Sequence, residues 1–234
     1  MTRLLLDVGN TRVKYALDRG PMAAVVHGGD VAAAVAWVLR DAGAVDEVAL
    51  VDVTGAARTV LGAQSVRELH SSAASCGVVN GYAEPARLGA DRWAALIGAR
   101  ALAAGPVPVI DAGSALTCDV LGGDGRHRGG WIAPGLELSL AALAHGTHGA
   151  RSERRGLPSS APATETAAAL HSGVRHAVLG FIERCTHAAA AELGPGAVRL
   201  LCGGDAAALA PDLSDARRVD DLVLRGLAHW LDAA

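Results

Sequence analysis

The sequence predicts an α/β protein built from two similar halves, each a mixed β-sheet flanked by helices. Strand-like and helix-like stretches alternate along the 234 residues, and Gly105-Pro106 interrupts the pattern near the middle. Each half opens with a short apolar run that ends in an Asp-x-Gly turn, first at Asp7 and again at Asp111. A repeated start indicates an internal duplication, so we expect one domain over residues 1–105 and a second over 106–234.

The first half is expected to begin with an antiparallel hairpin. Residues 3–8 and 12–17 are apolar strands joined by a tight turn at Gly9-Asn10, and 23–27 adds a third strand. The elements that follow are a helix from the cap Asp30 to about Ala42, a strand over 47–53, a short helix over 55–61, strand fragments within 66–90 with a loop at 80–85, and a helix from Asp91 to about Ala104.

The second half repeats this order after the break. Its predicted elements are strands over 107–110, 115–121 and 129–132, a helix over 136–145, a mobile loop over 146–164, a long alanine-rich helix over 165–193, a strand over 198–202 and a C-terminal helix from Asp220. Gly113 makes the turn between the first two of these strands.

Composition narrows the class of protein. The formal net charge is -3 and the pI about 6.3, so there is no general electrostatic footprint for nucleic acid or for an anionic membrane. No uninterrupted apolar run is long enough to cross a bilayer, and the first residues lack the features of a signal peptide. We therefore expect a globular protein of the cytoplasm that binds neither nucleic acid nor membrane.

Cysteine and histidine spacing argues against a structural metal centre. Cys76, Cys118, Cys185 and Cys202 are dispersed, without a C-x-x-C pair, and are expected to be buried reduced thiols. None of the nine histidines forms an H-E-x-x-H motif.

Lys14 is the only lysine among 21 basic residues, and it lies directly after the first Asp-x-Gly turn. A compact ammonium beside a glycine turn is commonly found at the phosphates of a nucleotide. A solvated strand position is the alternative for this residue taken alone.

The two turns favour phosphate chemistry. A tight turn after a strand exposes backbone N–H groups, glycine allows an anion to approach, and an aspartate at the strand end can hold a hydrated cation. The chain has no G-x-x-x-x-G-K-[ST] loop, and Gly123-Asp124-Gly125 lacks the third glycine of a dinucleotide fingerprint. Two hairpin turns that clamp one polyphosphate remain as the prediction.

At these residues the chain resembles the type III pantothenate kinases, within the sugar kinase, Hsp70 and actin superfamily. The resemblance spans almost the whole chain and rests on four motifs in order: Asp7 to Lys14, Tyr82 with Leu88-Gly89-Ala90-Asp91-Arg92-Trp93, Asp111-Ala112-Gly113-Ser114-Ala115-Leu116-Thr117, and Gly129 to Leu136. It implies a two-domain actin-like (ribonuclease H-like) duplicated fold. It also implies ATP-dependent phosphorylation of pantothenate to 4'-phosphopantothenate, the first step of coenzyme A biosynthesis.

The resemblance also implies a role for each matching residue. Asp91 would be the general base, and the residues around ATP would be Asp7, Val8, Gly9, Asn10, Thr11, Arg12, Val13, Lys14 and Ser114. The residues that hold pantothenate would be Tyr82, Gly89, Ala90, Asp91, Arg92 and Thr166. Asp7 would organise Mg²⁺ through water, and Asp111 would bind an activating monovalent cation, K⁺ or NH₄⁺. A homodimer is implied as well, with the helix over 165–193 as the candidate interface.

Some alternatives stay open at this stage. Asp91 taken alone would be a helix N-cap, and Thr166 alone a polar residue of a first helical turn. Ser114 replaces the threonine usual in the family, which keeps the hydroxyl and loses the methyl group. A regulatory protein that kept the fold without turnover, or a kinase of another small alcohol, would share the phosphate motifs.

Overall fold

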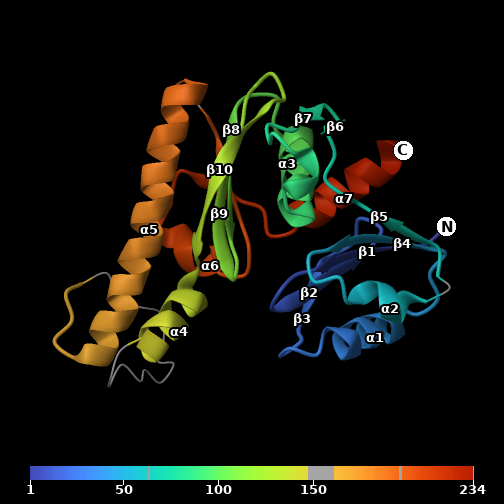
Figure 1. Cartoon of the computed structure of the whole chain (residues 1–234), viewed down its shortest axis with the longest axis horizontal. Coiled ribbons are helices and arrows are strands. Elements are labelled where there is room, and N and C mark those ends of the chain that lie inside the picture. Colours follow the sequence, from blue (N-terminus) through green and yellow to red (C-terminus); the bar gives the residue numbers. More distant parts are fainter. Residues whose placement is uncertain (63, 147–160, 195–196, 234) are drawn as a thin grey trace. The chain divides into compact units, whose positions relative to one another are not determined.

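The computed structural model describes residues 1–62, 64–146, 161–194 and 197–233, shown in Figure 1. Contacts within the chain group it into two compact units. Unit 1 contains Met1–Gly105, Leu121–Gly129 and the segment that starts at Asp221, and unit 2 contains Pro106–Val120 and Gly130–Asp220. The C-terminal helix and the segment 121–129 thus lie with the first half, whereas the expected boundary at 105/106 assigned them to the second. That boundary stays a prediction for the domains.

Unit 1 is built on a five-stranded sheet in the order β3-β2-β1-β4-β5. The strands are β1 (Arg3–Val8), β2 (Arg12–Leu17), β3 (Ala23–Val26), β4 (Glu47–Asp52) and β5 (Val66–Glu68). β2 is antiparallel to both β1 and β3, while β4 is parallel to both β1 and β5. The predicted hairpin is therefore confirmed, and it forms one side of a mixed sheet.

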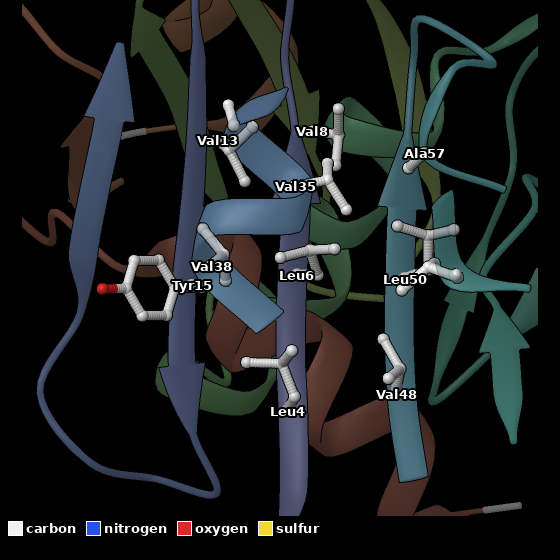
Figure 2. Close-up of a cluster of buried hydrophobic side chains, with 12 residues drawn as sticks. Leu4, Leu6, Val8, Val13, Tyr15, Val35, Val38, Val48, Leu50 and Ala57 are labelled. Atoms are coloured by element: carbon white, nitrogen blue, oxygen red, sulfur yellow. The ribbon is translucent and has the colours of Figure 1, made fainter. Parts of the chain in front are cut away.

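One face of this sheet packs against α1 (Val31–Ala42) and α2 (Ala57–Leu61). Figure 2 shows Leu4, Leu6 and Val8 of β1 directed toward Val35 and Val38 of α1, and all five side chains are fully buried. Alternate residues of a strand point to opposite faces. Asp7 therefore lies on the face opposite this core, which matters for the site below.

The opposite face is covered by α3 (Ala90–Leu102) and α7 (Leu222–Ala233), which contact β4 and, for α7, also β1. The two helices pack closely because glycines meet at their contact. A Cβ at Gly226 would lie 1.8 Å from the Ala94 carbonyl oxygen, and one at Gly98 would lie 2.4 Å from the Leu222 carbonyl oxygen. Burial on both faces explains why β1 and β4 are almost continuously apolar.

The remaining elements of unit 1 are short. The expected cap of α1 is confirmed, because Asp30 Oδ1 accepts the Ala33 N–H at 2.9 Å. Between β5 and α3 lie a small hairpin, β6 (Ala74–Ser75) with β7 (Val78–Val79), and a 3₁₀ turn, η1 (Pro85–Arg87). This segment carries the predicted loop at 80–85.

The sheet of the second half has the order β10-β9-β8-β11-β12, which matches the first sheet strand for strand. Its strands are β8 (Val107–Ala112), β9 (Ala115–Leu121), β10 (His127–Pro134), β11 (Arg199–Cys202) and β12 (Ala216–Arg218). β11 is parallel to β8 and to β12, as β4 is to β1 and β5. The predicted duplication is confirmed at the level of topology.

Unit 2 contains α4 (Leu136–Gly146), α5 (Thr166–Leu193), α6 (Ala206–Leu209) and the 3₁₀ turn η2 (Ala210–Asp212). Figure 1 shows α5 as a long helix along the sheet, and Val178, Ile182 and Cys185 of this helix join Ile110 and Leu201 in the core. Nη2 of buried Arg175 donates to the Ala208 carbonyl and to the Asp212 carboxylate. The helix predicted over 165–193 is confirmed to within one residue.

Four short elements escaped the sequence pattern: η1, α6, η2 and β12. Each is three or four residues long, too short to show a period. Residues 147–160, most of the loop expected over 146–164, lie outside the described residues.

The cysteines were expected to be buried reduced thiols. Cys118, Cys185 and Cys202 are buried, Cys76 is only half-buried, and none of the four forms a disulfide. Burial raises the pKa of the Cys118 thiol to about 12, so it stays protonated. In the part of the chain that the structure describes, no helix is long and apolar enough to span a membrane.

Candidate active site

The first Asp-x-Gly turn joins β1 to β2. The Gly9 N–H donates to the Arg12 carbonyl at 3.0 Å and closes the turn. A Cβ at Gly9 would lie 3.3 Å from that carbonyl oxygen, tighter than an ordinary contact, so glycine suits the position. Asn10 and Thr11 are exposed at the tip. The turn thus offers backbone donors and short polar side chains beyond the end of β1, which is an arrangement that suits a phosphate.

Two residues expected around ATP face the core instead. Val8 and Val13 are opposite each other in the β1–β2 register, and both side chains are fully buried. They support the turn from beneath, so any contact of theirs with a nucleotide would come from the backbone.

Asp7 and Lys14 lie opposite each other in the same register, one step further from the turn. Cross-strand partners share a face of the sheet. Lys14 Nζ therefore comes within 3.5 Å of Asp7 Oδ2, with the two side chains 18% and 5% exposed. A carboxylate this buried needs a compensating charge, and the only lysine of the chain supplies one. The solvated-strand alternative for Lys14 is therefore not what the structure shows.

His27 also contacts this turn, and sequence reasoning missed it. It follows β3, and its N–H donates to the Thr11 carbonyl at 3.2 Å. Its Nε2 lies 3.2 Å from the Gly9 carbonyl oxygen, while its Nδ1 accepts the Gly29 N–H at 3.1 Å. An Nδ1 that accepts leaves Nε2 to carry the hydrogen, so the ring bonds to the back of the turn. No sequence signal marked this residue.

The second Asp-x-Gly turn joins β8 to β9 in unit 2. The Gly113 N–H donates to the Ala115 carbonyl at 3.1 Å, and Ser114 is exposed at the tip, as Asn10 is in unit 1. The Gly135 N–H donates to the Ser114 carbonyl at 3.0 Å. A Cβ at Gly135 would lie 2.2 Å from the Gly113 carbonyl oxygen, so the Pro134-Gly135 sequence allows the end of β10 to close on this turn.

Asp111 ends β8 beside two glycines. A Cβ at Gly203 would lie 2.4 Å from Asp111 Oδ1, and one at Gly113 would lie 3.2 Å from it. Gly203 also has a φ of +100°, which favours glycine. The Asp111 carboxylate therefore lies in a space that side chains at these two positions would fill.

The residues expected to hold the acceptor gather at the start of α3 in unit 1. Arg92 Nη1 donates to the Tyr82 hydroxyl at 2.9 Å, and the guanidinium carbon lies 5.6 Å from the Tyr82 ring centroid. Arg92 is only 8% exposed. Because a guanidinium has donors and no acceptor, the Tyr82 oxygen is the acceptor in this bond, and its own O–H is left to donate to something else.

Asp91 is the second residue of α3, after Ala90 and the N-cap Gly89. Its Oδ1 accepts the Arg92 N–H at 2.8 Å. A Cβ at Gly89 would lie 2.6 Å from the same oxygen, so glycine is required for Asp91 to adopt this position. The alternative of Asp91 as the helix N-cap is not what the structure shows, because Gly89 holds that position and α3 has no side-chain cap hydrogen bond.

Sequence reasoning also missed two residues that touch Tyr82. Asn80 Oδ1 accepts the Tyr82 N–H at 3.0 Å, and the His127 ring stacks on the Tyr82 ring with centroids 5.8 Å apart. The Asn80-Gly81 pair is a turn signal that pointed toward the first of them. His127 is 45 residues away from Tyr82 in sequence, and no local pattern pointed toward it.

Thr166 is the first residue of α5 and is exposed. It lies in unit 2, whereas Tyr82 and Arg92 lie in unit 1. Its part in holding the substrate stays a prediction.

The donor groups suit metal ions of two kinds. Among the described residues no cluster of three or more His, Cys, Asp or Glu side chains could hold a metal. Mg²⁺ at phosphates needs only one or two carboxylates, with waters and phosphate oxygens as its other ligands, and Asp7 fits that role. The Asp111 carboxylate and the Ala112 carbonyl oxygen both lie beside Gly203, and oxygens of these kinds are the ligands that a K⁺ ion would take.

Comparisons with known proteins agree on one family. The family model described as type III pantothenate kinase matches residues 3–188. A type III pantothenate kinase of Aromatoleum aromaticum is 43% identical, over 96% of each chain. Another, of Halorhodospira halophila, is 39% identical over 97% of each chain.

Solved structures share the fold. A Baf family transcriptional activator from Campylobacter jejuni superposes with a TM-score of 0.68, at 22% identity, over 98% of this chain and 97% of that one. An archaeal actin homologue gives a TM-score of 0.57 at 10% identity, over the whole of both chains. At these identities the likeness shows the fold alone, and it confirms the predicted actin-like class.

Proposed function

Because the chain belongs to the type III pantothenate kinase family, we propose that it transfers the γ-phosphoryl group of ATP to the primary alcohol of pantothenate, the first step of coenzyme A biosynthesis. The family is a family of kinases, so the enzyme class follows from membership. The single observation that carries the acceptor side is the Arg92 to Tyr82 hydrogen bond beside Asp91, because buried donors there suit a small polar molecule.

The first turn would bind the phosphates. Gly9 would let a phosphate approach the turn, Asn10 and Thr11 at its tip and the Lys14 ammonium would contact phosphate oxygens, and Asp7 would hold Mg²⁺ through water. When bound, Mg²⁺ would neutralise charge on the phosphates. Lys14 would then face two anions, since its ammonium already lies 3.5 Å from the Asp7 carboxylate. Ser114 and the second turn would contribute further contacts to ATP.

Asp91 would act as the base for the acceptor alcohol. In the transfer, the alcohol oxygen forms a bond to the γ-phosphorus, the bond from that phosphorus to the ADP oxygen breaks, and the alcohol proton passes to the Asp91 carboxylate. The transition state of phosphoryl transfer is loose, so positioning the alcohol is worth more than early removal of its proton. Arg92, Tyr82 and Thr166 would hold the rest of pantothenate.

A monovalent cation, K⁺ or NH₄⁺, would bind at Asp111. The support is the carboxylate at the end of β8 with glycines at positions 113 and 203. A cation there would offset negative charge beside the second turn.

We propose a homodimer as well. Apolar side chains are exposed on both faces of the edge strand β10 and on α4 of unit 2: Trp131 is 40% exposed, Ile132 62% and Leu138 52%. α4 buries none of its residues, although leucine and alanine dominate it. A second copy would cover part of this exposed apolar area, and α5 is the other expected contributor. Sedimentation of the wild type and of Ile132→Asp tests this: the variant should shift toward the monomer.

A coupled assay of ADP release tests the activity. Pantothenate should support turnover with ATP and Mg²⁺, and a panel of other small alcohols should not. If only a different alcohol supported turnover, that alcohol would be the substrate in place of pantothenate. If no alcohol supported turnover, a regulatory role would be favoured.

A further inference from the structure

Tyr82 is held from several sides by groups outside the expected site. We infer that Asn80 and His127 are positioning residues for Tyr82, Asn80 through its backbone and His127 through its ring. The inference rests on the proposed function, because it assigns Tyr82 to the acceptor site. Neither residue would touch the substrate.

Asn80 links both ends of the loop that carries Tyr82. Its Nδ2 has two hydrogens for three acceptors, Ser71 Oγ at 3.0 Å, the Ser72 carbonyl at 3.2 Å and the Pro85 carbonyl at 3.2 Å, so two acceptors share one hydrogen. Its Oδ1 accepts the Tyr82 N–H at 3.0 Å. The side chain is buried, with 8% exposed. One amide thus ties the chain before the loop to the chain after it, and fixes the Tyr82 backbone between them.

The bond to Pro85 extends this restraint toward α3. Pro85 begins η1, which leads through Leu88 and Gly89 into the helix that carries Asp91 and Arg92. Asn80 therefore sets the distance between the Tyr82 backbone and the helix start at which the acceptor side chains lie.

His127 restrains the ring. The planes of the two rings differ by only 18°, and His127 is 1% exposed. The buried imidazole therefore limits the movement of the Tyr82 ring. The backbones also meet, since a Cβ at Gly81 would lie 1.9 Å from the His127 carbonyl oxygen. Nearby, the Val79 N–H donates to the Gly125 carbonyl at 2.9 Å. The loop is thereby docked on the segment Leu121–Gly129.

These restraints act on the Tyr82 hydroxyl. That hydroxyl accepts from Arg92 at 2.9 Å, and its direction sets where its own proton can be donated. With the ring held by His127 and the backbone by Asn80, few rotations remain to be lost when the substrate binds, and a rigid site binds more tightly.

Asn80→Asp tests the backbone restraint, because it keeps the shape and the oxygen that accepts from Tyr82 and removes the amide donors. We expect the KM for pantothenate to rise about tenfold, while the KM for ATP stays within about twofold. Ser71→Ala removes only one acceptor of the amide, so it should raise the pantothenate KM by less. This milder variant keeps the test valid if Asn80→Asp does not fold.

His127→Ala and His127→Phe test the ring restraint. The alanine variant loses the stack and should raise the KM for pantothenate, whereas phenylalanine keeps a flat ring and should restore it toward the wild-type value. Tyr15→Phe is the matched control, since it removes a part-buried hydrogen bond from unit 1, to Asp41, away from this loop. It should leave both KM values unchanged.

Amide hydrogen exchange of the variants gives a readout independent of turnover. Faster exchange over residues 80–88 in Asn80→Asp, with the β1 and β4 amides unchanged, supports positioning even if another alcohol proves to be the substrate. If the wild type does not phosphorylate pantothenate, the proposed function fails and the exchange result still decides the inference. The inference is overturned if both Asn80→Asp and His127→Ala show the same KM for pantothenate and the same amide hydrogen exchange as the wild type. It is also overturned if the variants lose activity only in proportion to a lower melting temperature, with the KM for pantothenate unchanged.

Discussion

The Lys14 ammonium lies 3.5 Å from the Asp7 carboxylate because β1 and β2 place the two residues opposite each other, next to the phosphate-type turn. The pair joins the anion that would hold Mg²⁺ to the cation that would contact ATP. Substitutions of this pair therefore test the part of the site that would bind ATP, the phosphoryl donor.

Lys14→Met should raise the KM for ATP about tenfold or more and change the KM for pantothenate much less, because a charge-assisted contact to phosphate is lost. Lys14→Arg keeps the charge with a different shape and should give a smaller rise. Steady-state kinetics with each substrate varied in turn measures both constants. An unchanged ATP dependence in Lys14→Met would remove Lys14 from the phosphate site.

Asp91→Asn should lower kcat about 10²- to 10⁴-fold, since the amide cannot accept the alcohol proton. The amide oxygen can still accept the Arg92 N–H that Asp91 Oδ1 accepts at 2.8 Å, so the fold should survive. Turnover and melting temperature are measured together. Near-wild-type turnover would exclude Asp91 as the base.

Gly89→Ala should reduce turnover without unfolding the chain. The added Cβ would lie 2.6 Å from Asp91 Oδ1, so the carboxylate must move away from its present position. Gly105→Ala is the control, because a Cβ there meets nothing within 4 Å. Equal activity of the two variants would show that the position of Asp91 is not critical.

Potassium or ammonium should raise the rate over that in sodium at constant ionic strength, and Asp111→Asn should abolish the difference. The reason is that the variant loses the charge at the proposed cation site. Initial rates in the three salts measure the effect. A wild type that is equally fast in sodium would argue against this site.

The free energy of unfolding should fall between about pH 10 and about pH 12 because Tyr15 loses its proton there. Its hydroxyl donates to Asp41 Oδ2 at 2.6 Å, and this bond, with burial and the Asp41 charge, raises the pKa of Tyr15 from 10.0 to about 12. The folded state therefore keeps a proton that the unfolded state releases above pH 10. Tyr15→Phe should cost about 1 kcal/mol at neutral pH.

The difference between Tyr15→Phe and the wild type isolates this group from others that titrate in alkali. Urea unfolding at several pH values from 9 to 12 measures it. The gap between the two proteins should close as the pH rises, and a constant gap would exclude Tyr15 as the source.

Much of the fold could be predicted from the sequence, because strands and long helices show a regular spacing of apolar residues. β1, β2 and α5 were predicted to within one residue. The packing of α7 in unit 1 was not predictable. α7 contacts α3 through glycines more than a hundred residues apart, and a glycine in the sequence does not indicate which helix it will contact.

The candidate site divides in the same way. The motifs at Asp7, Asp91 and Asp111 are continuous in sequence, and so the sequence by itself determined the family, the reaction expected of it and the residues to test. It also singled out Lys14 as the exception among 21 basic residues.

Only the tertiary structure decided which groups support those motifs. The antiparallel register pairs Lys14 with Asp7, and packing of segments apart in sequence brings His127 onto Tyr82 and His27 onto the first turn. The physical reason is that hydrogen bonds, stacking and charge pairing act over a few ångströms in space, whereas a sequence pattern records only neighbours along the chain.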